Sequence, residues 1–213
     1  MSKLIFKCEK KTLQEKTNED PGVGKAVKNA HLLENPLETL ESLAIGSELK
    51  NGKKCEVKHF KAQQLSASQE KWLMDLMTRN MKHMYKKALD GWRPKKKWKE
   101  MTEKTSRYLI ATVDGKPVAF SHFRFDMDYG REVLYCYEIQ VESATRSIGL
   151  GKLIMEILEK MASQANLPLV VLTVFKFNLP SLGFFKNLGY DVDETSPGDD
   201  EFKDYVIMSK SVC

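Results

Sequence analysis

The sequence predicts an α+β fold in which a mixed, mostly antiparallel sheet is flanked by helices and preceded by a helical N-terminal extension. Three observations predict it. Apolar and polar residues alternate on both sides of Asp114-Gly115, a dipeptide that tolerates the positive φ angles of a tight hairpin turn. A glycine-rich turn at residues 146–153 separates a strand pattern from a helix pattern. Residues 169–174 form an unbroken, β-branched apolar run, which is typical of a buried strand.

Residues 1–53 are predicted to form the extension. Helix-forming residues are interrupted there at Pro21-Gly22 and Asn35-Pro36, which indicates short helices separated by turns. Residues 54–213 then have an ordinary length for one domain with a single core. The alternation of apolar and polar residues from 54 to 60 favours a first strand at the edge of the sheet.

A long helix and a lysine-rich segment come next. Residues 68–89 carry apolar side chains at helical spacing, and Ser68 offers an oxygen that can cap the first turn. Residues 95–104 are rich in lysine, and the simplest interpretation is a solvated helix face. The alternative is a weak contact between Lys95–Lys99 and a polyanion on the ribosome or the nucleosome.

The second half of the chain completes the sheet. An antiparallel meander is predicted from strand patterns at 108–113, 118–125 and 133–141. A helix is expected from about residue 149 to 161, and a shorter helix from 181 to 188 that ends at Gly189. Residues 190–192 and 205–208 are predicted to form a final hairpin around an acidic loop.

Composition excludes several classes of protein. With 42% hydrophobic and 30% charged residues among 213, the chain is expected to be globular and not disordered. The net charge of +5 is too small to indicate nucleic-acid binding by itself. The four cysteines form no Cys-x-x-Cys pair, so we expect neither a metal site nor a disulfide framework. We expect no membrane segment, a monomer, and a location in the cytoplasm and nucleus.

The glycine-rich turn is the strongest chemical signal. In Arg146-Ser-Ile-Gly149-Leu-Gly151-Lys, glycines follow a strand and open a helix, where free amides and the helix dipole favour a pyrophosphate. Taken alone, the glycines could equally serve only to shape a tight turn. The pattern resembles the Arg/Gln-x-x-Gly-x-Gly/Ala signature of the GNAT acetyltransferases, which implies the GNAT fold and acetyl-CoA as co-substrate. The resemblance implies cofactor contacts at Ile139, Gln140, Val141, Arg146, Ser147, Ile148, Gly149, Leu150, Gly151, Lys152, Thr173, Asn178 and Phe185.

A second segment, residues 178–190, resembles the Asn-to-Gly-Phe block of the same family. Asn178 is thereby implied to touch the pantetheine or phosphate region of the cofactor. Many family members carry a tyrosine near Phe185 that protonates the departing thiolate, and phenylalanine cannot donate a proton. A thiol pKa of about 8.5 allows the thiolate to leave without such help. The alternative is a degenerate domain that binds acyl-CoA or peptide without turnover.

The segments 121–126 and 132–141 resemble histone-directed N-terminal acetyltransferases of the NatD type. These enzymes acetylate the α-amino group of histones four and two-A, whose mature chains begin Ser-Gly-Arg-Gly. The resemblance extends from about Trp72 to Tyr190 and implies Glu138 as the general base, with Tyr137 and Tyr85 as further catalytic residues. The implied peptide pocket contains Tyr85, Asp126, Tyr135 and Tyr137, and we add Asp90 and Trp92 from a segment that departs from the pattern of the resemblance.

The acceptor half raises a geometric question. Strict alternation sends Tyr137 and Glu138 to opposite faces of their strand, so both can serve one site only if the strand is distorted. We therefore predict a β-bulge near residues 137–141. Asp90 departs from the pattern of the resemblance and would add negative charge for an arginine of the acceptor. His122 is interpreted as a packed strand residue.

The acceptor stays open on residue patterns alone. The acidic loop at 191–201 is either a soluble mobile hairpin or a surface that steers a basic histone tail. A GNAT enzyme that acts on lysine side chains or small amines would share the whole cofactor half and differ only in the acceptor pocket.

Overall fold

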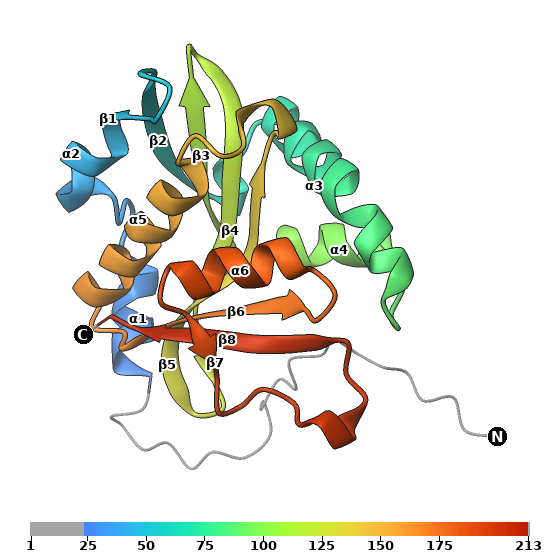
Figure 1. Ribbon diagram of the computed structural model, residues 1–213. Helices are drawn as coiled ribbons and strands as arrows, with labels where there is room; N and C mark the ends of the chain where they lie inside the picture. Colours follow the sequence, from blue (N-terminus) through green and yellow to red (C-terminus); the bar gives the residue numbers. More distant parts are fainter. Residues whose placement is uncertain (1–23, 213) are drawn as a thin grey trace.

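The computed structural model describes residues 24–212, and its centre is one eight-stranded sheet (Figure 1). The strand order is β1-β2-β3-β4-β5-β6-β8-β7. Only the β5–β6 pair is parallel, and every other neighbouring pair is antiparallel, so the predicted mixed, mostly antiparallel sheet is confirmed. The strands are β1 Ile45–Glu48, β2 Lys54–Lys61, β3 Arg107–Val113, β4 Lys116–Asp128, β5 Arg131–Val141, β6 Leu169–Phe175, β7 Asp191–Val192 and β8 Tyr205–Ser211.

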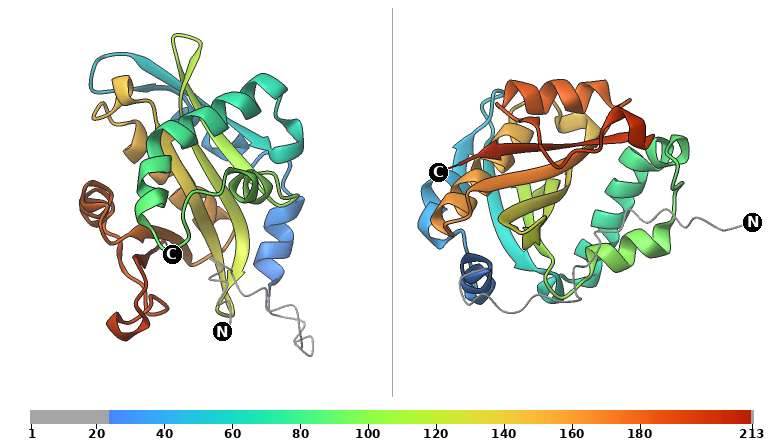
Figure 2. Two further views of the ribbon diagram at one scale, coloured as in Figure 1. Left: turned by 90° about the vertical axis from the view of Figure 1, so that its right-hand side faces the viewer. Right: turned by 90° about the horizontal axis from the view of Figure 1, so that it is seen from below.

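Helices cover both faces of the sheet (Figures 1 and 2). The larger core joins the sheet to α1, α2, α5 and α6, and a smaller core joins it to α3 and α4. The α-helices are α1 Lys25–Leu32, α2 Glu41–Ala44, α3 Ala67–Lys87, α4 Pro94–Met101, α5 Leu150–Gln164 and α6 Leu179–Asn187. Short 3-10 turns are η1 Glu38–Leu40, η2 Ala62–Gln64, η3 Ser143–Thr145 and η4 Asp199–Glu201.

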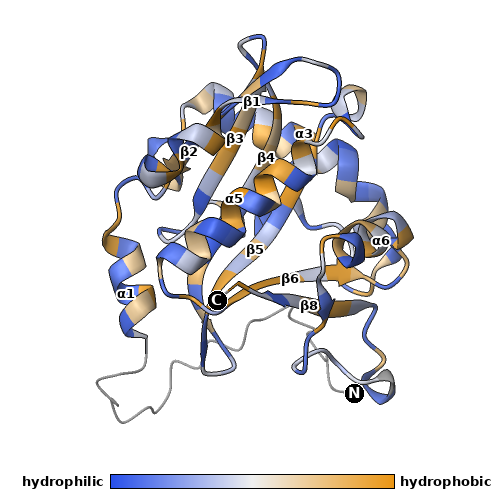
Figure 3. Ribbon diagram, turned by 60° about the vertical axis from the view of Figure 1, so that its left-hand side comes forward, coloured by the Kyte–Doolittle hydropathy of each residue, from blue (hydrophilic) through white to orange (hydrophobic). Residues whose placement is uncertain are grey.

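Local sequence explains where α3 begins and which face of α5 is buried. Ser66 caps α3 by accepting a hydrogen bond from the Gln69 amide at 3.3 Å, while the Gln69 side chain accepts one from the Ser66 amide. The prediction of Ser68 as the cap was therefore wrong by two residues, because the reciprocal bond needs glutamine three positions after the cap. Helix α5 buries a continuous apolar face against the sheet, as its hydropathy pattern shows in Figure 3.

The N-terminal extension contributes a strand as well as helices. Strand β1 pairs with β2, so the prediction that residues 54–60 form an edge strand was wrong. The isolated pattern at 45–48 is too short to identify a strand, and only the pairing with β2 makes it one. Pro21-Gly22 and the first part of the predicted extension lie outside the described residues.

The β4–β5 and β5–β6 pairings each have an irregularity that shapes the candidate site. His122 pairs with Glu138, but the next residue, Phe123, pairs with Cys136, so Tyr137 is an extra residue on β5. The parallel ladder between β5 and β6 runs only from Val133 to Cys136, although both strands continue. Between residues 24 and 212, no helix combines the length and apolar character required to cross a membrane.

Candidate active site

The bulge at Tyr137 turns two adjacent side chains toward the same helix. The Glu138 carboxylate contacts Lys97 of α4. The Tyr137 ring lies 4.5 Å below the guanidinium carbon of Arg124, which itself donates a hydrogen bond to the Glu100 carbonyl of α4. The predicted β-bulge is confirmed, and it removes the conflict between strand alternation and a shared site.

Glu138 is a buried carboxylate with defined partners. Its side chain is 6% exposed, one oxygen contacts Lys97, and the other accepts a hydrogen bond from Gln140 Nε2 at 2.9 Å. Burial raises the pKa of the Glu138 carboxyl above its ordinary value, while Lys97 acts in the opposite direction. A raised pKa makes this carboxylate a better proton acceptor than an exposed glutamate.

Gln140 was predicted as a cofactor contact, but its side chain belongs to the acid–base side of the site. Its amide nitrogen donates to Glu138, and its amide oxygen accepts from Asn80 Nδ2 at 3.0 Å. Asn80 of α3 also accepts a hydrogen bond from Arg146 at 2.8 Å. Gln140 and Asn80 thus connect the proposed base with the glycine-rich turn.

The lysine-rich segment forms α4, and one of its lysines is buried. Lys97 is 8% exposed, whereas Lys95, Lys96 and Lys99 are exposed. The interpretation of the whole segment as a solvated face was therefore wrong for Lys97. The polyanion contact of the three exposed lysines stays a prediction.

Aromatic rings form a wall beside Glu138. The Tyr85 ring lies 5.5 Å from the Trp92 ring and 5.2 Å, edge to face, from the Phe175 ring. Lys97 Nζ is 5.6 Å from the centroid of Tyr85. Burial raises the pKa of the Tyr85 hydroxyl, so this group stays protonated at neutral pH and can donate a hydrogen bond.

Hydroxyl groups connect three strands next to this wall. Tyr137 Oη donates to Asp126 Oδ2 of β4 at 3.2 Å, and the Tyr135 and Tyr137 rings lie 4.9 Å apart. Tyr135 Oη and Thr173 Oγ1 of β6 are 2.6 Å apart. Burial raises the pKa of Tyr137, as it does that of Tyr85. The contacts bring four predicted site residues, on β4, β5 and β6, into one network.

His122 is a packing residue, as predicted. It is fully buried, and its ring stacks between Tyr108 at 5.2 Å and Tyr137 at 5.0 Å. A ring nitrogen lies 2.9 Å from Ser106 Oγ. The stack supports the Tyr137 ring from below.

The loop after α3 carries Asp90 and Trp92. Asp90 is half-buried, and its carbonyl accepts a hydrogen bond from Arg93 Nε at 3.1 Å. The Leu89 amide donates to Asp204 Oδ2 at 2.8 Å, which ties this loop to the segment that follows the acidic loop. Within the acidic loop, Asp193 pairs with Arg131 at 2.9 Å, so part of its negative charge is neutralised.

The glycine-rich turn has the conformation of an anion cradle. Gly149 caps α5 with φ of 102°, and Ser147 has φ of 64°. The first intrahelical bond is donated by the Leu153 amide to the Gly149 carbonyl at 3.0 Å. The amides of residues 150–152 therefore precede the hydrogen-bonded part of the helix and are oriented toward its N-terminal end.

Neighbouring elements fix this turn in place. The Lys50 amide, from the extension, donates to the Ile148 carbonyl at 3.0 Å. A Cβ on Gly151 would lie 3.1 Å from Phe184, so this glycine allows α5 and α6 to pack closely. The Leu150 side chain is buried in the core, while Lys152 is exposed. A tight, well-supported turn fits a pyrophosphate.

The gap in the ladder lies next to the cradle. Beyond Cys136 and Leu172, β5 and β6 continue without pairing to each other. Strand edges expose alternate amides and carbonyls, so residues 139–141 have main-chain groups directed to this gap. A pantetheine arm, which carries amide groups, fits such an edge. The contacts predicted at Ile139 and Val141 are consistent with this geometry.

Two predicted cofactor residues have structural roles as well. Asn178 caps α6, because its Oδ1 accepts a hydrogen bond from the Ser181 amide at 3.4 Å. Phe185 is 5% exposed and packs edge to face on Tyr190, with ring centroids 5.8 Å apart. A contact of either side chain with the cofactor stays a prediction.

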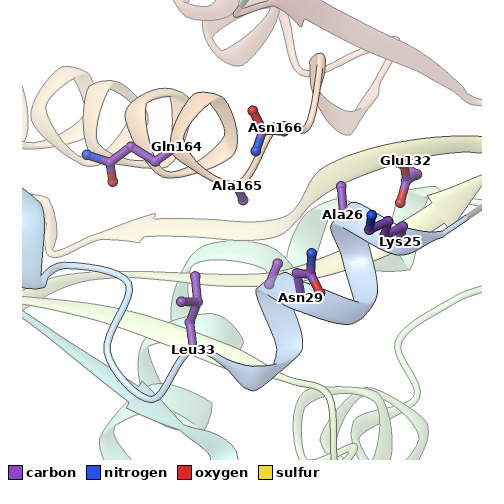
Figure 4. A pocket seen from close by; sticks show the side chains of 9 residues that line it. Lys25, Ala26, Asn29, Leu33, Glu132, Gln164, Ala165 and Asn166 are labelled. Atoms are coloured by element: carbon purple, nitrogen blue, oxygen red, sulfur yellow. The ribbon is translucent and has the colours of Figure 1, made fainter.

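One cavity, of about 460 Å³, lies away from this site, between α1, the start of β5 and the end of α5 (Figure 4). It is lined by Lys25, Ala26, Asn29, Ala30, Leu33, Glu132, Gln164, Ala165 and Asn166. None of the predicted site residues is among them, so the candidate site rests on its contacts. Over the described range 24–212, no group of three metal-ligating side chains was found.

Sequence reasoning missed Lys97, Arg124, Asn80 and Phe175. The spacing of Lys97 and Met101, both buried and four residues apart on α4, was the available signal for an inward-facing lysine. Asn80 lies one turn before Met84 and Tyr85 on α3 and had no comparable signal.

Comparison with known proteins identifies the family of this fold. The model of the acetyltransferase (GNAT) family matches residues 70–190, more than half of the chain. Three similar solved structures show a likeness of fold alone. Naa50 from Arabidopsis thaliana, in complex with the bisubstrate analogue CoA-Ac-MVNAL, has a TM-score of 0.52 and 19% identity, over 73% of this chain and 98% of that chain. Ard1 from Thermoplasma volcanium has a TM-score of 0.53 and 15% identity, over 75% and 98% of the two chains, and the PaiA N-acetyltransferase from Thermoplasma acidophilum, in complex with coenzyme A, has a TM-score of 0.55 and 15% identity, over 73% and 99%. The chain therefore belongs to the acetyltransferase (GNAT) family and is an acetyl-CoA-dependent acetyltransferase.

Proposed function

We propose that this protein transfers the acetyl group of acetyl-CoA to the α-amino group of a peptide N-terminus. The proposed acceptors are histones four and two-A, with the mature start Ser-Gly-Arg-Gly. The observation that carries the proposal is the bulge that turns Glu138 and Tyr137 toward the same helix, α4, beside the edge of β5. N-terminal acetyltransferases among the similar folds add support for this class of acceptor.

The proposed reaction is direct transfer. An α-amine has a pKa of about 8 and is mostly protonated at neutral pH, so its ammonium form must lose a proton. Glu138 accepts that proton, and the amine nitrogen attacks the acetyl carbonyl carbon. The new C–N bond forms as the C–S bond of the thioester breaks, and the electron pair leaves on the CoA thiolate. The thiolate is a good enough leaving group to depart without a tyrosine at position 185.

Charge and hydrogen bonding suit the acceptor peptide. Among the carboxylates of β4, Asp126 is the one nearest along the ladder to Glu138, the proposed base on β5. It accepts a hydrogen bond from Tyr137. Asp90 and Trp92 lie on the loop that is tied to Asp204. We propose that Asp126 and Asp90 bind the arginine of Ser-Gly-Arg-Gly by charge-assisted hydrogen bonds, while Tyr85 and Tyr135 enclose the small first residues.

The experiment that tests the proposal is acetyl transfer to a Ser-Gly-Arg-Gly peptide that also contains a lysine, followed by mass mapping of the product. The proposal predicts acetylation at the α-amine and none at the lysine. A matched peptide with a blocked α-amine should give no product. Acetylation of the lysine, with the α-amine left free, would contradict the proposal and favour the lysine-directed alternative. Binding of acetyl-CoA and peptide without release of CoA would favour a non-catalytic module.

A further inference from the structure

Lys97 is a buried cation between two carboxylates. It lies on α4, and its Nζ contacts a Glu138 oxygen and lies 2.6 Å from Glu100 Oε1. The Lys97 side chain is 9% exposed, the Glu138 side chain 6% and the Glu100 side chain 32%. The ammonium is therefore withdrawn from water together with the proposed base, while Glu100 reaches the surface.

A buried carboxylate needs such a partner. Transfer of a charged carboxylate from water to a protein interior favours its protonated form, and a protonated carboxyl cannot accept a proton from the acceptor amine. The titratable and charged neighbours of Glu138 decide the outcome. They are Tyr85 on α3, Lys97 and Glu100 on α4, Tyr108 on β3, His122 and Arg124 on β4, and Cys136 on β5.

Among these neighbours Lys97 is the cation in direct contact with the Glu138 carboxylate. The guanidinium of Arg124 instead binds Glu103 and the Glu100 carbonyl, and it covers the Tyr137 ring. The charges of Glu138 and Glu100 outweigh the effect of burial and raise the pKa of Lys97, which keeps this lysine protonated. Lys97 therefore provides a permanent positive charge next to the base.

We propose that Lys97 is a positioning residue for acetyl transfer, whose ammonium group keeps the buried Glu138 ionised and fixes the orientation of its carboxylate. This inference rests on the proposed function of Glu138 as the base. Lys97 holds one carboxylate oxygen and Gln140 holds the other, which fixes the plane of the group. Each oxygen has a second lone pair, so one remains available for the acceptor amine.

The proton balance requires Lys97 to stay protonated throughout. The proton leaves the α-ammonium of the peptide and moves to Glu138, while the C–N bond forms and the C–S bond breaks. Glu138 returns that proton to solvent after the product leaves. Burial strengthens Glu138 as a base and Lys97 weakens it, and the opposing effects leave a carboxylate that is ionised and still basic.

The test is the pH dependence of kcat/KM for Lys97→Met, measured with one peptide so that titration of the acceptor amine is common to all variants. Methionine matches the length of the lysine stem but carries no charge. The activity lost on the acid side should move to higher pH by about 1 unit or more, and activity should recover as pH rises. At pH 7 the loss should be about tenfold or greater, with the Kd of acetyl-CoA unchanged.

Three further variants separate charge from packing. Lys97→Arg keeps the charge and should keep the wild-type profile. Glu100→Gln removes a negative charge near Glu138 and should move the profile the opposite way, to lower pH. Lys95→Met changes an exposed lysine on the same helix and is the matched control, with no expected effect. Thermal unfolding of each variant checks that it is folded at the assay temperature.

The double variant Lys97→Met/Glu138→Gln guards against a purely structural explanation. If Lys97 acts through Glu138, its loss should add nothing to the effect of Glu138→Gln on turnover. The proposal would be overturned if kcat/KM of Lys97→Met and of the wild type fell at the same pH on the acid side. Additive losses of turnover in the double variant would also overturn it. If the wild type acetylates another class of amine, the proposed acceptor is wrong, and the same comparison with that amine still tests Lys97.

Discussion

Tyr135 Oη and Thr173 Oγ1 lie 2.6 Å apart and join β5 to β6 near the point where the parallel ladder ends. The bond closes one end of the gap that is proposed to receive the pantetheine arm. It is a contact between two hydroxyl groups, one on each strand. A pair of this kind is suited to a double-mutant cycle.

We expect Tyr135→Phe and Thr173→Val to destabilise the protein and to do so non-additively. Either change removes the bond, so the coupling energy should be about 0.5 to 1.5 kcal/mol in the free energy of unfolding. Phenylalanine keeps the ring contact with Tyr137, which isolates the hydroxyl. Denaturant unfolding of the four proteins measures the cycle, and strictly additive effects would show that the two hydroxyls do not interact.

The positive φ of Gly149 leads to a second prediction. Alanine is strained at φ of 102°, so Gly149→Ala should cost about 1 to 3 kcal/mol in stability and weaken acetyl-CoA binding. Gly183→Ala is the control. It lies within α6, a Cβ there meets no atom within 4 Å, and alanine favours a helix by up to about 1 kcal/mol. The thermal unfolding midpoint should therefore fall for Gly149→Ala and rise for Gly183→Ala. Changes of the same sign in the two variants would contradict this account of the turn.

Asp193 gives a third prediction, on stability against pH. Burial acts to raise the pKa of Asp193, but the hydrogen bonds from Arg131, Ser209 and Thr195 outweigh it, and the pKa is lowered. Because the pKa is lowered, the pair stabilises the protein at pH values above about 4, the pKa of an aspartate in the unfolded chain. This stability is lost as the pH falls below that value.

Asp193→Asn should accordingly destabilise the protein at pH 7 by about 1.5 to 3 kcal/mol. The difference from wild type should shrink below about pH 4, because Asp193 of the unfolded wild-type chain then binds a proton that the folded protein, with its lowered pKa, does not bind. Asp114→Asn, at an exposed pair with Lys53, should change the unfolding midpoint little. A difference for Asp193→Asn that stays constant from pH 7 to pH 3 would contradict the assignment of charge to this pair.

The acceptor pocket gives a fourth prediction. Replacement of the arginine in a Ser-Gly-Arg-Gly peptide by alanine should lower kcat/KM about tenfold to more than a hundredfold, because a charge-assisted contact contributes about 1.5 to 3 kcal/mol. Lysine at the same peptide position keeps the charge without the bidentate geometry, and it should give an intermediate value. Equal turnover of the arginine and alanine peptides would refute a carboxylate pocket built from Asp126 and Asp90.

Much of the fold could be predicted because its signals are local. The turn at Asp114-Gly115, the glycine cap of α5 and the apolar run of β6 depend on residues within a few positions. The bulge at Tyr137 was also predictable, because two adjacent residues assigned to one site cannot both fit a regular strand.

The features that were missed depend on long-range packing. Lys97 stands among similar lysines, and beyond its four-residue spacing to Met101 it is the packing of α4 near β5 that distinguishes it as the buried one. Strand β1 has four residues, and it exists as a strand because β2 supplies its partner. The capping of α3 by Ser66 in place of Ser68 follows from Gln69, a reciprocal contact that the position of a serine alone does not reveal.

The central claim is that Glu138 accepts the proton of the acceptor amine, and Glu138→Gln tests it most directly. Glutamine preserves the size of the side chain but accepts no proton. In single-turnover assays on the Ser-Gly-Arg-Gly peptide, the rate should fall about a hundredfold to ten-thousandfold with acetyl-CoA affinity unchanged. Glu132→Gln, the same substitution near the other end of β5, should retain the wild-type rate. A wild-type rate for Glu138→Gln under these conditions would contradict the claim and shift the role to a water held by Tyr85 or Tyr137.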